Sequence, residues 1–236
     1  MLAVVDHRAP EAIIRGLLGC GFDILKMPSH PDLPHPVAAH PDMLLFFARD
    51  RILCTQVYAQ IAKKELEILS KATSKPMVCV EEAVSAQYPS DILLNAAVVG
   101  NTLICRTDHT AKALLADTEY TVCNTRQGYA KCSTLPIGDR ALITADPSIA
   151  RVARENAFDV LKVEESPIEI LQYDNGFIGG ASSYAPYTEL RELYFCGDWK
   201  SHRNANEIEE FCHKHKRIPI ALADRPLVDL GTVFLI

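Results

Sequence analysis

A pattern of two apolar strands, a helix and a third strand recurs along this chain. In the first copy, HPDMLLFFARDRILC (40–54) gives two apolar segments around a charged turn, an amphipathic segment follows at 58–71, and PMVCV (76–80) gives a strand. Three further copies place their hairpins at 88–105, 128–144 and 174–196. The second strands end near residues 54, 105, 144, 196 and 236, at intervals of about 40 to 50 residues, which is typical of repeat architectures.

Turn and cap residues support the later copies. Gly100-Asn101 and Gly138-Asp139 are suited to tight hairpin turns. Asp146-Pro147 has the composition of an N-cap followed by the first residue of a helix. Together with the apolar spacing, these signals predict helices at 109–116, 147–156 and 206–216, and strands at 120–124, 158–163, 193–196 and 218–222.

The fifth copy is divided between the two ends of the chain. A strand at 2–6, a helix at 9–18 and a strand at 22–25 lack only a first hairpin strand, which residues 226–236 can supply. We therefore predict an α/β (α+β) fold: one domain over 1–236, a pseudo-fivefold, five-bladed propeller of ββαβ modules whose terminal strands close one module. The alternative is a doubly wound sheet, but that fold needs one strand per helix, and the paired strands favour the ring.

The amino-acid composition limits the classes of partner and the compartment expected for this protein. With 48% hydrophobic and 23% charged residues, the chain is expected to be soluble and globular. A net charge of −6 disfavours nucleic acid as a partner, and the basic run 213–217 is interpreted as the end of a helix. No signal peptide is evident and no segment approaches the ~20 apolar residues that cross a bilayer, so we expect a cytoplasmic protein without a membrane partner. Eight scattered cysteines without a C-x-x-C pair are expected to be free thiols.

Four segments resemble a known superfamily in their order and spacing. They are AVVDHRAPEAI (3–13), GFDILKMPSHPDLPHPVAAHPDMLLFF (21–47), GYAKCS (128–133) and PLVDLGTVFLI (226–236). These segments resemble dimethylarginine dimethylaminohydrolases, members of the pentein or guanidino-group-modifying superfamily to which amidinotransferases also belong, and the chain is similar to a bacterial branch of it. The resemblance implies the five-bladed fold and a small guanidino or amidino ligand, such as an arginine derivative.

The resemblance also assigns roles and reveals departures. It places Asp42 at the carboxylate that binds guanidinium. Where the family has its catalytic His, this chain has Tyr129 or a neighbour, and no Cys lies close to Gly231, where the nucleophile belongs. Thiol attack needs a thiolate and a proton carrier, so the family mechanism lacks its usual groups here. An enzyme of this kind would be amidinohydrolase- or amidinotransferase-like.

Polar residues of the first strands are expected to meet on the axis of the ring and form a small-molecule site. Cys132 is the candidate nucleophile, because the ammonium of Lys131 would lower the pKa of its thiol, and His40 is the candidate base. The predicted binding residues are Asp42, Asp91, Asn95, Lys131, Asn175, Gly180, Ser182 and Asp229.

Two other sites are not supported by the sequence. His30, His35 and His40 are evenly spaced, but no nearby Cys joins them and the spacing does not set a metal geometry, so no metal is expected. NGFIGGAS (175–182) lacks the G-x-G-x-x-G spacing and leads into a strand, so no nucleotide cofactor is expected. The second functional hypothesis is a non-enzymatic protein of the same fold, a small-molecule sensor or a macromolecular interaction partner. The oligomeric state is not indicated.

Overall fold

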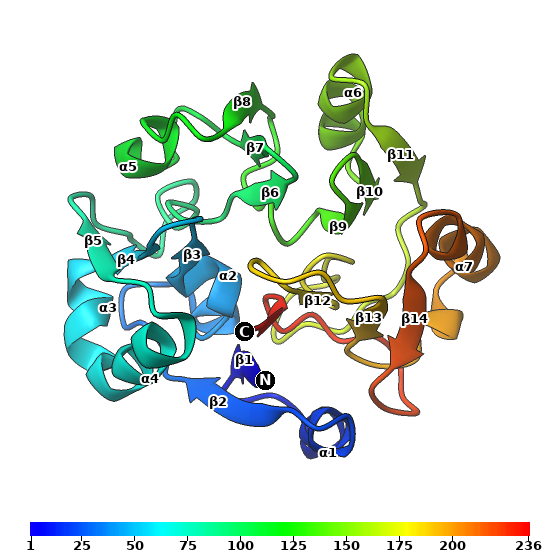
Figure 1. Ribbon diagram of the computed structural model, residues 1–236, viewed down its shortest axis with the longest axis horizontal. Helices are drawn as coiled ribbons and strands as arrows, with labels where there is room; N and C mark the ends of the chain where they lie inside the picture. The colour runs from blue at the N-terminus through cyan, green and yellow to red at the C-terminus, as the bar shows by residue number, and fades with distance from the viewer.

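The structure, a computed structural model, describes residues 1–236, and its strands form five small sheets that follow one another around a common centre (Figure 1). Three sheets have three strands each: β3 (Phe46–Phe47), β4 (Ile52–Thr55) and β5 (Met77–Val80); β6 (Ala97–Val99), β7 (Thr102–Cys105) and β8 (Thr121–Asn124); β9 (Leu135–Gly138), β10 (Ala141–Thr144) and β11 (Asp159–Lys162). The other two contain β13 (Glu192–Phe195) with β14 (Ile218–Ala221), and β12 (Ser183–Tyr184), β15 (Val233–Leu235), β1 (Leu2–Asp6) and β2 (Asp23–Met27). The predicted α/β class is confirmed.

Each sheet contains a parallel pair of strands whose connection includes a helix on the outside of the molecule (Figure 1). The outer helices are α1 (Glu11–Gly19), α3 (Gln56–Ile61), α4 (Lys63–Thr73), α5 (Lys112–Leu115), α6 (Pro147–Glu155) and α7 (Ala205–Lys214). Shorter turns are η1 (His35–Val37), α2 (Pro41–Leu44) and η2 (Trp199–Ser201). The strand–helix–strand order predicted from the sequence is observed in all five sheets.

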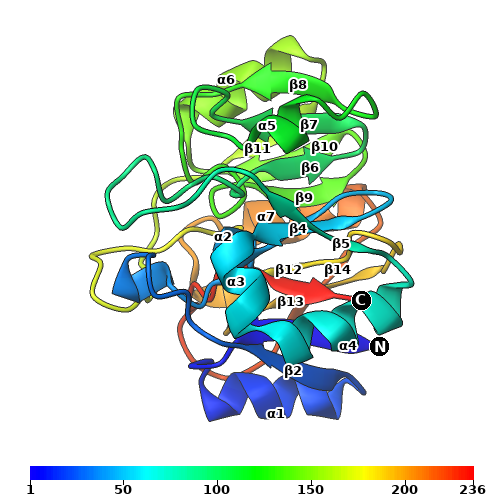
Figure 2. The ribbon, with the colours of Figure 1, turned by 90° about the vertical axis from the view of Figure 1, so that its left-hand side faces the viewer.

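The two ends of the chain lie side by side, near each other in both views (Figure 1, Figure 2). Strand β15 pairs antiparallel with β1, with Ala3 opposite Leu235. The Leu2 amide donates to the Ile236 carbonyl at 2.7 Å, and the Ile236 amide donates back at 2.8 Å. The prediction that the C-terminal segment supplies the missing strand of the N-terminal module is confirmed.

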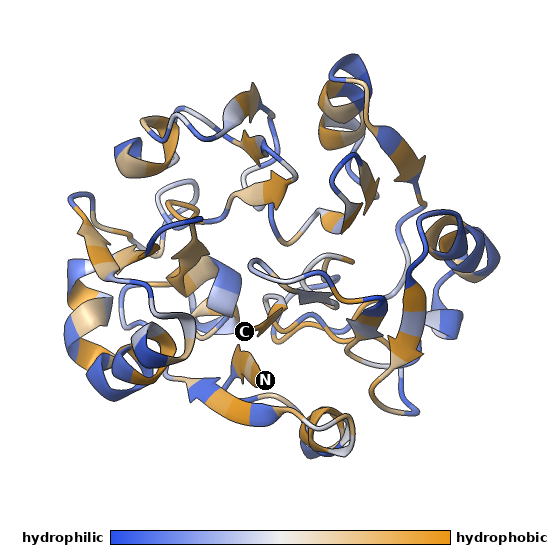
Figure 3. Ribbon diagram, in the orientation of Figure 1, coloured by the Kyte–Doolittle hydropathy of each residue, from blue (hydrophilic) through white to orange (hydrophobic).

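The apolar residues form several clusters between the sheets and the outer helices. Strands are mostly apolar, whereas the outer helices mix apolar and polar residues (Figure 3). Helix α6 buries Ile149 and Val152 in one cluster with Ile104 and Leu142. It begins as predicted, because the Asp146 carboxylate accepts the two backbone N–H groups of residues 148 and 149 at 2.8 Å. No helix combines the length and apolar character needed to cross a membrane.

Several predicted boundaries were wrong. Residues 41–44, predicted as a polar entry and the beginning of an apolar strand, form the helical turn α2, because Pro41 fixes φ at its first position and has no N–H to donate. The hairpin predicted from residue 88 begins only at Ala97, and the segment 58–71 forms parts of two helices, with a break at Ala62.

The fourth hairpin also differs from the prediction. Strand β12 pairs with β15 instead of β13, and only one isolated bridge, between Ser182 and Phe195, joins the predicted partners. The Val233 amide donates to the Ser182 carbonyl at 3.0 Å, so the last strand of the chain takes the place beside β12.

Candidate functional site

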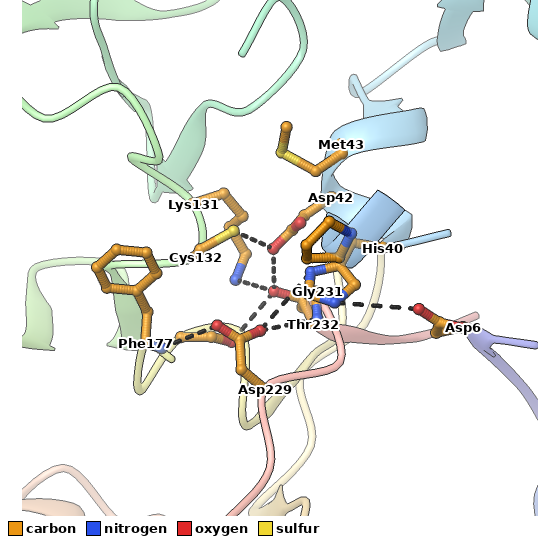
Figure 4. Close-up of polar contacts among 12 residues, drawn as sticks. Asp6, His40, Asp42, Met43, Lys131, Cys132, Phe177, Asp229, Gly231 and Thr232 are labelled. Atoms are coloured by element: carbon orange, nitrogen blue, oxygen red, sulfur yellow. Dashed lines mark hydrogen bonds and ion pairs between the residues drawn. The ribbon is translucent and has the colours of Figure 1, made fainter. Parts of the chain in front are cut away.

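Polar side chains from three distant segments meet at the centre of the molecule, where a fourth segment adds backbone groups (Figure 4). The turn α2, the 128–134 turn, the 175–182 segment and the residues before β15 bring them together. We call the following residues the central cluster: His40, Asp42, Lys131, Cys132, Asp229 and Thr232. Each is at most 3% exposed. Buried polar groups are costly unless paired, so their contacts define what the centre can do.

Asp42 accepts two side-chain hydrogen bonds at the same oxygen. The Cys132 thiol donates to Asp42 Oδ2 at 3.1 Å, and the Thr232 hydroxyl donates to it at 2.9 Å. Asp42 Oδ1 has no partner. The Asp42 backbone N–H donates to the Gly231 carbonyl at 3.0 Å and so ties α2 to the C-terminal segment.

Asn95 connects two segments of the central cluster through its side-chain amide. Its Oδ1 accepts the Lys131 backbone N–H at 2.8 Å, and its Nδ2 donates to the Asp42 carbonyl at 3.1 Å and to Cys132 Sγ at 3.2 Å. The side chain thus joins α2 to the 131–132 turn. This predicted binding residue has the contacts of a positioning residue.

Lys131 is a buried cation within this acidic centre. Its Nζ donates to Thr232 Oγ1 at 2.9 Å and lies 5.4 Å from the centre of the Tyr184 ring. Burial lowers the pKa of Lys131, while the charge of Asp42 opposes that shift. Lys131 Nζ therefore reaches Asp42 only through the Thr232 hydroxyl, which contacts both groups.

The thiol of Cys132 is not activated in the way the sequence suggested. Burial, followed by the charges of Asp42 and Asp229, raises the pKa of Cys132 well above its usual value. The ammonium of Lys131 bonds Thr232 instead of the thiol. The expectation of a lowered thiol pKa was wrong because desolvation and the carboxylates outweigh the neighbouring cation.

His40 lies between two buried carboxylates. Its Nδ1 is 3.8 Å from Asp229 Oδ1, its Nε2 is 3.9 Å from Asp6 Oδ2, and Nδ1 has no hydrogen-bond partner. Arg8 fixes Asp6 with contacts of 2.9 Å from Nε to Oδ1 and 2.6 Å from Nη2 to Oδ2. His40 therefore lies next to Asp6 and Asp229, whereas the Cys132 thiol bonds Asp42.

Asp229 is held by backbone groups. It accepts the Phe177 N–H at 2.8 Å and the Gly231 N–H at 3.0 Å. Burial raises the pKa of Asp229, and the charge of Asp42 adds to that shift while His40 opposes it.

Backbone at the site is constrained by close packing. A Cβ at Gly180 would lie 1.9 Å from Asp229 Oδ1, and one at Gly231 would lie 2.1 Å from His40 Cβ. Thr232 has a φ of +65°, an uncommon conformation for a β-branched residue, and its hydroxyl is thereby placed between Lys131 and Asp42.

A cavity of about 350 Å³ opens beside the central cluster. Its lining residues are Val37, His40, Tyr88, Tyr129, Cys132, Ile170, Tyr173, Asn175, Phe177 and Asp229. The four aromatic side chains form what we call the aromatic wall, and Asp229 is the only Asp, Glu, Lys or Arg of the lining. The structure therefore places four of the predicted site residues on one cavity: His40, Cys132, Asn175 and Asp229.

The remaining predicted residues lie off this cavity. Asp91 is fully buried, and its Oδ2 accepts a hydrogen bond from the hydroxyl of Tyr129, a residue of the aromatic wall, at 2.5 Å. Burial raises the pKa of Asp91, and burial and this bond raise the pKa of Tyr129, so the phenol remains a donor. The Ser182 hydroxyl donates to the Gly179 carbonyl at 2.9 Å, and Gly180 packs against Asp229.

Sequence reasoning missed Thr232 and most of the aromatic wall as functional residues. The wall is assembled from four aromatic residues in three separate segments, which share no local pattern. The substitution of Tyr129 for the expected His was the one sequence signal that pointed to this wall.

The fold is similar to that of an amidinotransferase of known structure. SxtG, an amidinotransferase from Microseira wollei in the saxitoxin biosynthetic pathway, matches 94% of this chain and 88% of its own, with a TM-score of 0.55 and 10% sequence identity. C. jejuni agmatine deiminase matches 86% of this chain and 70% of its own, with a TM-score of 0.49 and 9% identity. The first likeness concerns the fold alone: this chain folds like that amidinotransferase.

The sequence itself places the chain more narrowly. Residues 4–234 match the family described as "Family of unknown function (DUF6873)", and the chain belongs to that family. No curated protein matches the chain.

Proposed function

We propose that this protein is a single-domain, five-bladed α/β propeller that binds a small guanidino or amidino compound in the cavity beside Asp229. The observation that carries the proposal is a buried carboxylate at the edge of a cavity with an aromatic wall and no Lys or Arg in its lining. A carboxylate holds a planar guanidinium or amidinium through paired hydrogen bonds. Aromatic faces attract such weakly hydrated cations.

Asp229 has the capacity to accept these bonds. Each of its oxygens accepts one backbone N–H and retains a further acceptor site. The unpartnered Nδ1 of His40 lies beside it, 3.8 Å from Oδ1. Asp42, which the resemblance assigned to guanidinium, bonds Cys132 and Thr232 instead, so we assign Asp229 to the ligand and Asp42 to the support of the central cluster.

Binding is favoured over thiol-dependent hydrolysis. Attack on a guanidinium carbon needs a thiolate, and the pKa of the Cys132 thiol is raised by burial and by nearby carboxylates. Hydrolysis or amidino transfer is the second candidate function, because Cys132 and His40 line the same cavity.

Isothermal titration calorimetry with methylguanidine, agmatine and phenylguanidine tests the binding proposal. We expect saturable binding of at least one compound, a rise in thermal stability with its concentration, and at least a tenfold loss of affinity in Asp229→Asn, as for the loss of a charged hydrogen-bonding partner. Asp224→Asn, at an exposed position, is the matched control and should bind normally. Absence of binding by all three compounds would refute the proposal. Release of ammonia or a urea from a bound compound would establish hydrolysis.

A further inference from the structure

The aromatic wall runs from the mouth of the cavity to Asp229. Tyr88 is 46% exposed at the mouth, and its ring centre is 5.7 Å from that of Tyr129. The Tyr129 ring is 6.0 Å from that of Phe177, with interplanar angles of 34° and 33° along the series. The Phe177 backbone N–H donates to Asp229, so the three rings form a series from the exposed Tyr88 to a residue that contacts the carboxylate.

The fourth member of the aromatic wall and a neighbouring leucine add exposed apolar surface beside the cavity. Tyr173, a lining residue, is 45% exposed, and Leu171, next to the lining residue Ile170, is also 45% exposed. Exposed large apolar side chains that gather around a cavity are a common feature of ligand-binding surfaces.

The lining offers no partner for a ligand carboxylate. It contains no Lys or Arg. The adjoining cavity, which shares Asp229 and Tyr173 with this one, is lined by two arginines, and both are already paired with carboxylates: Arg8 with Asp6 and Arg225 with Glu169. Arg106, which donates to the Tyr88 hydroxyl at 3.0 Å, is paired with Asp108 at 3.1 Å, and Lys131 is turned toward Thr232. Asp229 adds a negative charge that repels a second carboxylate, and an anion buried without a partner is strongly disfavoured.

On the basis of the proposed function, we infer that the ligand is a guanidino or amidino compound whose remainder is apolar and uncharged, such as an aryl guanidine, and that compounds with a carboxylate are excluded. The cation pairs with Asp229, and the apolar part lies along Phe177, Tyr129 and Tyr88. The cavity therefore discriminates against arginine and its α-carboxylate derivatives.

A matched pair of ligands tests this inference. Phenylguanidine and 4-guanidinobenzoate share the ring and the guanidinium and differ by one carboxylate, while methylguanidine lacks the ring. In calorimetric titrations at one pH and salt concentration, we expect phenylguanidine to bind at least tenfold more tightly than either of the others, and more tightly than arginine. Equal or tighter binding of arginine or 4-guanidinobenzoate would overturn the inference.

The two proposals fail in different ways. If methylguanidine, arginine and phenylguanidine all bind alike and all lose affinity in Asp229→Asn, the guanidinium site stands and the apolar-tail inference is wrong. If none binds, both are wrong.

A charge introduced at the mouth provides a second test. Tyr173→Lys should improve the affinity for 4-guanidinobenzoate relative to phenylguanidine about tenfold, because it supplies the missing partner for the carboxylate. Leu18→Lys adds the same charge at an exposed position of α1, outside the lining, and should leave the ratio unchanged. A ratio unaffected by Tyr173→Lys, in a variant that melts like the parent, would show that the missing cation is not what excludes carboxylates.

Discussion

Replacement of Lys131 by Met removes the only Lys or Arg of the central cluster and retains a long aliphatic side chain. The Lys131 side chain is 3% exposed, and its ammonium donates to Thr232, whose hydroxyl contacts Asp42. Loss of a hydrogen bond from a charged group costs about 1.5–3 kcal/mol. Asp42 also loses a nearby positive charge in a site where it is 1% exposed.

Two features limit the size of the effect. The ammonium reaches Asp42 through the Thr232 hydroxyl, so the loss is smaller than for a direct buried ion pair. Met also removes the cost of burying the ammonium, the cost that lowers the pKa of Lys131. We therefore expect Lys131→Met to lower the free energy of unfolding by about 1–2 kcal/mol. For a chain of this length that corresponds to a decrease in Tm of about 2–8 °C.

Urea denaturation followed by the fluorescence of Trp199, the only Trp and a buried residue, measures this change. The pKa of Lys131 is lower in the folded state than in the unfolded chain. Between these two pKa values, the unfolded chain therefore holds a proton on Lys131 that the folded protein has lost. As the pH rises across that interval, the free energy of unfolding of the wild type should therefore increase relative to that of Lys131→Met. Lys64→Met, at an exposed position of α4, should change stability by less than about 0.5 kcal/mol. An equally small change in Lys131→Met would refute the assigned role of the ammonium.

Three further outcomes are expected. Iodoacetamide should alkylate Cys132 of the folded protein far more slowly than the exposed Cys79, because burial and the carboxylates hold the thiol protonated; timed peptide mass spectrometry would reveal comparable rates if this reasoning is wrong. Affinity for a guanidinium ligand should fall as the pH decreases through the raised pKa of Asp229, because protonation removes the charge that holds the cation; a calorimetric profile without this decrease would contradict the assignment. Asp146→Ala should cost about 1 kcal/mol in urea denaturation by removing the N-cap of α6, and Asp146→Asn should restore most of it; equal stability of all three proteins would show that the cap contributes nothing.

The sequence determined the order of the elements and the closure of the chain. Gly100-Asn101 marks the turn between β6 and β7, Asp146-Pro147 begins α6, and the apolar C-terminal strand lies beside β1. These features follow from turn chemistry, capping and side-chain periodicity, which act over a few neighbouring residues and can be recognised in the sequence. The four predicted residues that line the cavity were found because polar residues of the first strand of each module were expected to meet on the axis of the ring.

Only the tertiary structure decided which of these groups face a ligand and in which protonation state. Asp42 and Asp229 are equivalent in residue type, but the first bonds Cys132 and Thr232 whereas the second borders the cavity. The pKa of Cys132 is raised, against the expectation from its neighbour Lys131, because burial and the carboxylates set the local electrostatics. Orientation, burial and charge environment arise from packing between segments far apart in the chain, and no local pattern in the sequence encodes them.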